Sequence, residues 1–89
     1  MSNFLLIRHK VRDYPLWKRG YDAHQSKRTE AGLTEKQLLR SENDDSEVVI
    51  LFEAKDLGRA RSFTDSADLK ETMQKLGVMD KPDIYFLHS

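Results

Sequence analysis

The sequence contains no cysteine, which excludes disulfide bonds, thiolate metal sites and a thiol nucleophile. It also lacks a surplus of charge, because fifteen basic residues balance fifteen acidic ones. Affinity for nucleic acid rests largely on surplus Lys and Arg, so nucleic acid is not expected as a partner. No apolar run approaches the roughly 20 residues that a membrane helix needs, so no membrane association is expected either.

The amino terminus has no basic segment before Phe4 and is not expected to be a secretory signal. We therefore expect a cytoplasmic protein. Eighty-nine residues is the size of one domain, and residues 1–89 are expected to form it alone. A chain this short buries only roughly 60–70% of the surface that it exposes when unfolded, so the core should be thin.

The first half of the chain predicts a strand, a helix and a second, weaker strand. Residues 4–11 are rich in side chains that suit a pleated surface, and both faces of this strand begin apolar. Residues 13–15 form a helix start, since Pro is tolerated in the first turn. Helical spacing then continues to about residue 29. The weaker strand is expected over 33–43, after Gly32.

The second half predicts strand, helix and strand. The turn at 42–46 leads to a strand over 47–55, which contains five consecutive apolar residues. A helix follows from Asp56 to Gly77, broken near residues 64–65, and the last strand is expected over 83–88. The order β-α-β-β-α-β predicts an α+β, ferredoxin-like fold with a four-stranded antiparallel sheet.

Two helices can cover only one face of such a sheet, yet the sequence makes both faces apolar. Val48, Ile50 and Phe52 alternate with Val49 and Leu51. Burial of one such side chain contributes about 1.5–3 kcal/mol, and monomers rarely expose large apolar patches. We therefore expect a homodimer with two-fold symmetry. The alternative is a monomer in which a long loop covers the second face, but no segment is spare to form that loop.

With this element order, the chain resembles the dimeric α+β barrel superfamily, of the antibiotic-biosynthesis-monooxygenase-like kind. Residues 14–17 look like the start of the first helix of that family. The resemblance is strongest between Arg40 and Val78, at Asp44, Asp45, Glu47, Val48, Val49, Leu51, Phe52, Glu53, Asp56, Leu57, Ala60, Phe63, Ser66, Leu69, Lys70, Met73, Gly77 and Val78. It implies a barrel formed between two protomers, with a ligand cavity between each sheet and its helices.

The activities that this resemblance implies are cofactor-free oxygenation of aromatic polyketides, haem degradation and ring isomerisation. The haem-degrading branch uses an Asn on the first strand, a Trp on the third strand and a His on the second helix. Asn3 matches the first, but the expected third strand has no Trp and the expected second helix has no His. We therefore expect no haem and no other cofactor.

His9 and His24 are the candidate catalytic residues. His9 shares a strand face with Leu5 and Ile7, and His24 lies on the same helix half as Trp17. If these two faces meet, both imidazoles approach one cavity and supply groups that titrate near neutrality. The alternative is that each is a buried, hydrogen-bonded histidine or reaches solvent at an edge.

Four further residues are candidate ligand-binding residues: Tyr14, Trp17 and Tyr21 as an aromatic wall, and Arg40 as an anion-binding group. The aromatic residues would otherwise anchor the helix to the sheet. Arg40, like Arg8, would otherwise pair with an acidic residue across the sheet. The histidines show no metal-ligand spacing, so no metal site is expected.

Two functions remain open from the sequence. In the first, a homodimer binds a small aromatic or hydrophobic metabolite between sheet and helices, and transforms it as a cofactor-free monooxygenase, cyclase or isomerase. In the second, the dimer is a non-catalytic module that binds a ligand or serves a structural role. The sequence does not tell whether Trp17 and Tyr21 themselves fill the cavity.

Overall fold

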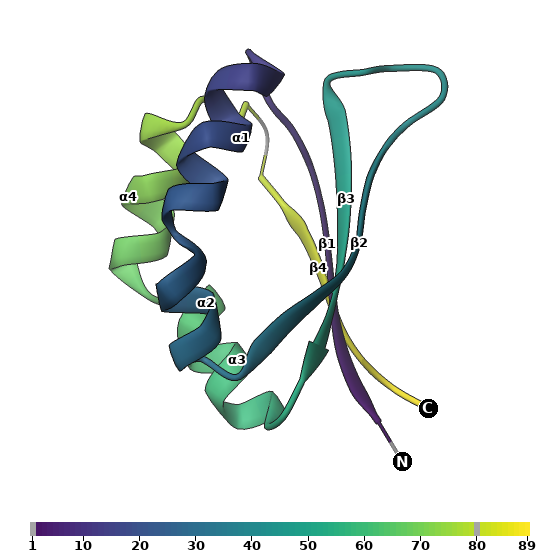
Figure 1. The fold of residues 1–89 in the computed structure, drawn as a ribbon, viewed down its shortest axis with the longest axis vertical. Helices are drawn as coiled ribbons and strands as arrows, with labels where there is room; N and C mark the ends of the chain where they lie inside the picture. Colours follow the sequence, from purple (N-terminus) through teal and green to yellow (C-terminus); the bar gives the residue numbers. More distant parts are fainter. Residues whose placement is uncertain (1, 80) are drawn as a thin grey trace.

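The computed structural model describes residues 2–79 and 81–89. Among these residues it contains four strands and four helices (Figure 1). The strands lie in the order β2-β3-β1-β4, and every neighbouring pair is antiparallel. This confirms the predicted α+β, ferredoxin-like fold. The elements are β1 (Asn3–Lys10), α1 (Tyr14–Ala23), α2 (Gln25–Glu30), β2 (Leu33–Arg40), β3 (Glu47–Ala54), α3 (Leu57–Thr64), α4 (Ala67–Lys75) and β4 (Asp83–His88).

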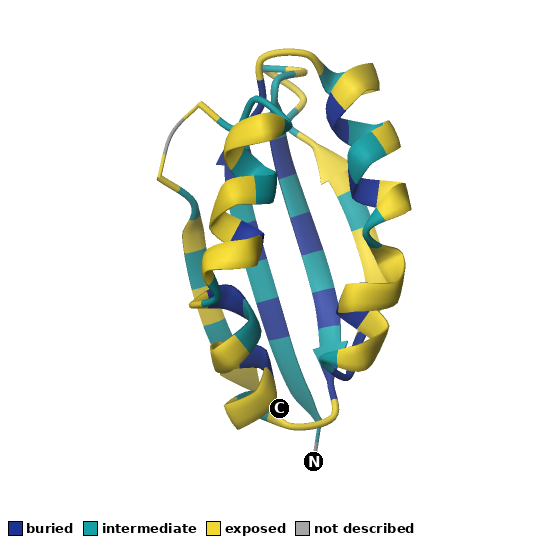
Figure 2. Ribbon diagram, turned by 90° about the vertical axis from the view of Figure 1, so that its left-hand side faces the viewer, coloured by how far each residue is buried: buried dark blue, intermediate teal, exposed yellow. Residues whose placement is uncertain are grey.

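All four helices lie on one side of the sheet, and no described element lies on the other side (Figure 1). We call these the covered face and the open face. Along β1 and β3, buried positions alternate with half-buried ones (Figure 2). This alternation follows from the pleat, which turns successive side chains to opposite faces.

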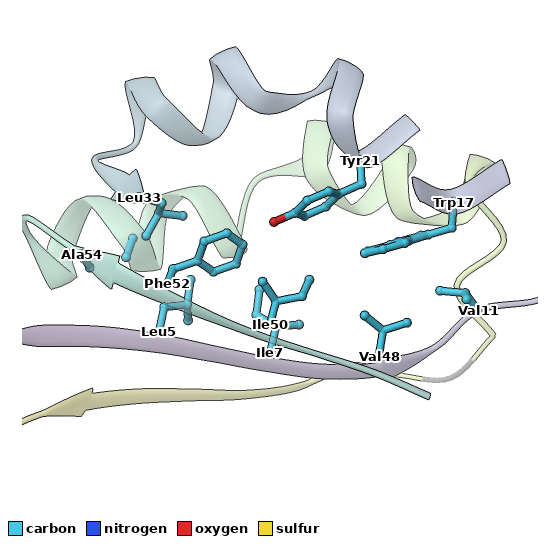
Figure 3. Close-up of a cluster of buried hydrophobic side chains, with 11 residues drawn as sticks. Leu5, Ile7, Val11, Trp17, Tyr21, Leu33, Val48, Ile50, Phe52 and Ala54 are labelled. Carbon is cyan, nitrogen blue, oxygen red and sulfur yellow. The ribbon is translucent and has the colours of Figure 1, made fainter. Parts of the chain in front are cut away.

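The hydrophobic core lies between the covered face and the helices (Figure 3). The sheet side chains point toward α1, whose Trp17 and Tyr21 point back toward the sheet. Leu16, which helical spacing places near these aromatic residues, is 45% exposed instead. The buried cluster consists of Leu5, Ile7, Val11, Trp17, Tyr21, Leu33, Val48, Ile50, Phe52, Ala54 and Ala60.

The prediction of one helix over residues 14–29 is wrong, because the helix breaks at His24. The backbone of His24 has φ −93° and ψ 9°, and its N–H reaches the carbonyl oxygens of Gly20 at 3.1 Å and Tyr21 at 3.2 Å. The Arg28 side chain also donates to the Tyr21 carbonyl, at 2.7 Å. A side-chain donor thus supports the carbonyl at the end of α1, where the helical bonding changes.

The break predicted near residues 64–65 is confirmed, since α3 ends at Thr64 and Ser66 caps α4 by accepting from the Leu69 N–H at 3.2 Å. Gly77 closes the segment, also as predicted, with φ +81°. The N–H of the following residue, Val78, donates to the Met73 carbonyl at 3.0 Å. This is the bonding of a Schellman C-cap, which favours glycine because of the positive φ.

The weaker strand ends earlier than predicted, at Arg40 rather than near residue 43. The pairing of β2 with β3 also shifts register between Glu35 and Gln37, which marks an irregularity of the bulge type. Most of β2 is exposed. As an edge strand with few apolar side chains, it gains little from continuing beyond the turn that starts at Ser41.

Candidate functional site

A small cavity of about 50 Å³ lies between the covered face and the helices. Its wall is mainly apolar and combines residues of β1, β3 and all the helical segments. The lining residues are Ile7, His9, Trp17, Tyr21, His24, Arg28, Ile50, Phe52, Phe63, Leu69, Thr72, Met73 and Leu76. An apolar cavity of roughly 150 Å³ is needed to hold a benzene ring, so this volume suits a few water molecules.

His9 brings a polar group into this wall from β1. It is 2% exposed, and its Nδ1 atom is buried without a hydrogen-bond partner among the described residues. Burial, followed by the charge of Arg8, lowers the pKa of His9 to about 4. Buried polar groups are nearly always hydrogen-bonded, so this nitrogen would gain from a partner that a ligand or a water molecule brought to it.

The lowered pKa corrects one expectation for His9. A group that titrates between pH 5 and 8 was expected, but a pKa of about 4 keeps this imidazole neutral over that range. In the neutral ring one nitrogen is a donor and the other an acceptor. At neutral pH, His9 is therefore suited to exchange a hydrogen bond with a ligand, and it is a weak base.

His24 lines the same cavity from the junction between α1 and α2. Its side chain is 19% exposed, and its Nε2 lies 3.7 Å from a carboxylate oxygen of Asp68. This contact is an ion pair only when the ring is protonated. The ring also lies 6.5 Å from that of Phe63, centroid to centroid. The structure thus brings His9 and His24 to one cavity, while their catalytic role stays a prediction.

Trp17 and Tyr21 form a stack in the cavity wall (Figure 3). Their ring centroids are 4.8 Å apart at 24°, and His9 meets Trp17 edge-on at 5.4 Å and 72°. The Tyr21 hydroxyl donates to Glu35 Oε1 at 2.7 Å, and burial raises the pKa of Tyr21. Tyr21 is therefore a fixed hydrogen-bond donor, and much of the space between sheet and α1 is filled by these two rings.

Tyr14 and Arg40 do not line the cavity, although both were candidate ligand-binding residues. The Arg40 guanidinium carbon lies 4.1 Å from the centroid of the Tyr14 ring, so the two contact each other. Arg8 lies on the open face, where it forms ion pairs with Glu47 and Asp83. Arg8 therefore pairs with acidic residues across the sheet, as the alternative to anion binding predicted.

Arg28 is a charged lining residue that sequence reasoning missed. It is 8% exposed, and α2 carries it into the cavity wall. The signal was present, because positions 17, 21, 24 and 28 repeat at spacings of four, three and four, which is one face of a helix.

The described residues gather no three-ligand metal group and do not reproduce the pattern of the haem-degrading branch. Among residues 2–79 and 81–89, no three His, Asp or Glu side chains are grouped so that they could hold a metal ion. Asn3, the one match to the haem-degrading pattern, pairs with Ala54 and His88 at one end of β1 and does not line the cavity. Within the described ranges, no helix is long and apolar enough to cross a membrane.

Comparison at the level of sequence finds no matching protein-family model and no matching curated protein. Comparison of structures finds close likenesses. An antibiotic biosynthesis monooxygenase-like protein from Bordetella bronchiseptica aligns with a TM-score of 0.77 over 100% of this chain and 98% of that one, at 14% identity. This chain has the antibiotic-biosynthesis-monooxygenase-like fold.

Two neighbours with this fold have named activities. SnoaB, a cofactor-independent oxygenase from Streptomyces nogalater, aligns with a TM-score of 0.72 over 99% of this chain and 92% of that one, at 13% identity. The monooxygenase ActVA-Orf6 of Streptomyces coelicolor, solved with nanaomycin D, aligns at 0.69 over 99% and 87%, at 19% identity. At such identities the likeness is one of fold, and function has to be argued from the site.

Proposed function

We propose that this protein is a homodimer that binds a small aromatic or hydrophobic metabolite in the cavity and transforms it without a cofactor, as a monooxygenase, cyclase or isomerase. One observation carries the proposal: His9, whose buried Nδ1 has no hydrogen-bond partner among the described residues, lines a mainly apolar cavity. The fold supports it, because solved proteins of the same fold include a cofactor-independent oxygenase and a monooxygenase in complex with nanaomycin D.

In this proposal the two histidines serve one ligand in different ways. The neutral ring of His9 exchanges a hydrogen bond with a polar group of the ligand. His24, which is partly exposed and lies 3.7 Å from Asp68, is the residue placed to move a proton to or from the ligand. The Trp17–Tyr21 stack supplies the apolar contact for the ligand.

The ligand has to enlarge the cavity, since about 50 Å³ is too small for an aromatic ring. The wall formed by α4 is the part suited to yield. Met73 and Leu76 are half-buried there, and methionine adapts easily to a new shape. Leu76 also packs against Gly20 of α1 so closely that a β-carbon at Gly20 would overlap it.

The dimer rests on the open face. Its apolar side chains are half-buried on β1 and β3, whereas Leu39, Tyr85 and Leu87 on the edge strands are 52%, 53% and 42% exposed. Two copies placed face to face would bury this patch, with Arg8 and its acidic partners beside it. The patch consists of Phe4, Leu6, Leu39, Val49, Leu51, Tyr85 and Leu87.

A non-catalytic dimeric module is the second candidate, and the small cavity favours it. Trp17 and Tyr21 occupy the space that a ligand would need, as aromatic side chains do when they only anchor a helix to a sheet. In that case His9 keeps its nitrogen unpartnered, or bonded to water, with no ligand involved.

Native mass spectrometry of freshly purified protein tests the proposal. A mass of two chains plus a small adduct supports it, and His9→Leu should lose the adduct while His88→Leu, on the exposed end of β4, keeps it. A two-chain mass without an adduct favours the non-catalytic module. A mass of one chain at every protein concentration contradicts the dimer.

A further inference from the structure

Arg28 is a buried cation that its surroundings only partly compensate. Its Nη1 donates to the Tyr21 carbonyl at 2.7 Å, and its guanidinium carbon lies 3.6 Å from the centroid of the Tyr21 ring. Burial lowers the pKa of Arg28. Buried arginines are usually paired with a carboxylate, because an isolated charge loses its hydration.

The acidic residues nearest to Arg28 are engaged elsewhere. Glu35 accepts the Tyr21 hydroxyl at 2.7 Å, and Asp22 pairs with Lys18 at 2.6 Å. Both contribute to the field at Arg28. Among the described residues, however, no carboxylate oxygen lies within the 4.0 Å of an ion pair from the Arg28 guanidinium.

The cavity wall carries positive charge and no negative charge. Among the described residues that line it, Arg28 is the one fixed ion, His9 and His24 are the other ionisable bases, and there is no Asp or Glu. The other lining residues, apart from Thr72 and the Tyr21 hydroxyl, are apolar. A ligand that brings a negative charge would thus meet a partly unpaired cation in surroundings of low dielectric constant, where charge-assisted hydrogen bonds are strong.

We propose that the cavity takes a small planar organic anion, whose carboxylate or phenolate oxygen binds Arg28 while its apolar body lies toward His9. This inference rests on the function proposed above and names its substrate class. A guanidinium has five N–H donors in one plane, and the Tyr21 carbonyl uses one of them. The remaining donors suit a planar oxyanion.

A purely structural role for Arg28 would be to cap the Tyr21 carbonyl where α1 ends. Loss of that cap would loosen the cavity for charged and neutral ligands alike. Selective loss of the charged ligand would instead identify anion recognition. The test therefore compares, for each variant, the affinities for a charged probe and a neutral probe of the same shape. The ratio of these two affinities, and not either affinity alone, is the readout.

The probes are 2-naphthoate and 2-naphthamide, which differ in charge but hardly in size, titrated against the protein by calorimetry. Wild-type protein should bind naphthoate about tenfold more tightly or better, as expected for a charge-assisted hydrogen bond. Arg28→Met should lose this preference, and Arg28→Lys should keep part of it. Arg19→Met, which removes an exposed arginine of α1 outside the cavity wall, should keep all of it.

A second pair, 4-nitrophenolate and nitrobenzene, tells a phenolate from a carboxylate as the preferred oxyanion. Equal binding of charged and neutral probes in both pairs overturns the anion proposal but leaves the cavity function standing. A preference that survives in Arg28→Met also overturns it.

If no probe binds at millimolar concentration, both proposals fail. If Arg28→Met does not fold, Arg28→Lys decides, and an undiminished preference there overturns the proposal.

Discussion

The two faces of the sheet are built from the same strands but end in different environments. On β3, Val48, Ile50 and Phe52 are 0–2% exposed against the helices, whereas Val49 and Leu51, one position along, are half-buried on the open face. The side chains are equally apolar. The difference therefore comes from what covers each face, and it separates a core that stabilises the fold from a surface that we assign to association.

The largest expected effect is at Phe52, compared with its neighbour Leu51. Phe52→Ala should lower the free energy of unfolding by about 3–5 kcal/mol, because it leaves a cavity in the core. Leu51→Ala should cost less, and its cost should rise with protein concentration, because the proposed wild-type dimer would be stabilised by mass action. Urea denaturation at two protein concentrations measures both. A Leu51→Ala cost that does not depend on concentration would count against the dimer.

The second prediction concerns stability in acid, which should depend on His9 of the covered face. Its pKa is about 4 in the folded protein and near 6.5 when unfolded, so the unfolded chain binds the proton first as the pH falls. The free energy of unfolding should thus fall by about 3 kcal/mol between pH 6.5 and 4, and be unaffected by His9 above pH 6.5.

His9→Leu should remove most of this pH dependence, and it should keep or raise the stability at pH 7 because it deletes an unpartnered buried nitrogen. His88→Leu, at an exposed position, serves as the control. Urea denaturation over the pH range makes the measurement. If His9→Leu instead destabilises the protein at pH 7, His9 has a hydrogen-bonded structural role.

The third prediction introduces a charge on the open face. It should affect the fold least, because it should act on dimerisation alone. Leu51→Lys should weaken dimerisation by about 100-fold or more, because two copies bring two unpaired ammonium groups into the contact. The monomer should stay folded, since the side chain faces solvent there. Analytical ultracentrifugation and circular dichroism measure the two outcomes. Gln25→Lys adds the same charge on an exposed helix and should leave the dimer intact.

Much of the fold could be predicted from local sequence. The apolar run 48–52, the turn residues before it and the glycine at 77 each specify their own conformation, and the structure agrees with all three. The break at His24 could not be predicted, because helical spacing continues through it. A side chain four residues later, Arg28, supports the carbonyl where α1 ends, and that contact exists only in the folded chain.

The candidate site, too, could be predicted only in part from local sequence. Periodicity correctly placed His9, Trp17, Tyr21 and His24 around one space, since each element presents one face to its neighbour. It also included Tyr14, which contacts Arg40 outside the cavity wall.

By itself, the sequence determined the order of the elements, the apolar character of both sheet faces and the absence of thiol chemistry. Only the tertiary structure decided which face the helices cover, that His9 is desolvated to a pKa of about 4, and that Arg28 is buried with no ion-pair partner among the described residues. The reason is physical. Propensity and periodicity are local properties of the chain, whereas burial, and with it the charge state and the partners of a side chain, depends on which distant segments pack around it.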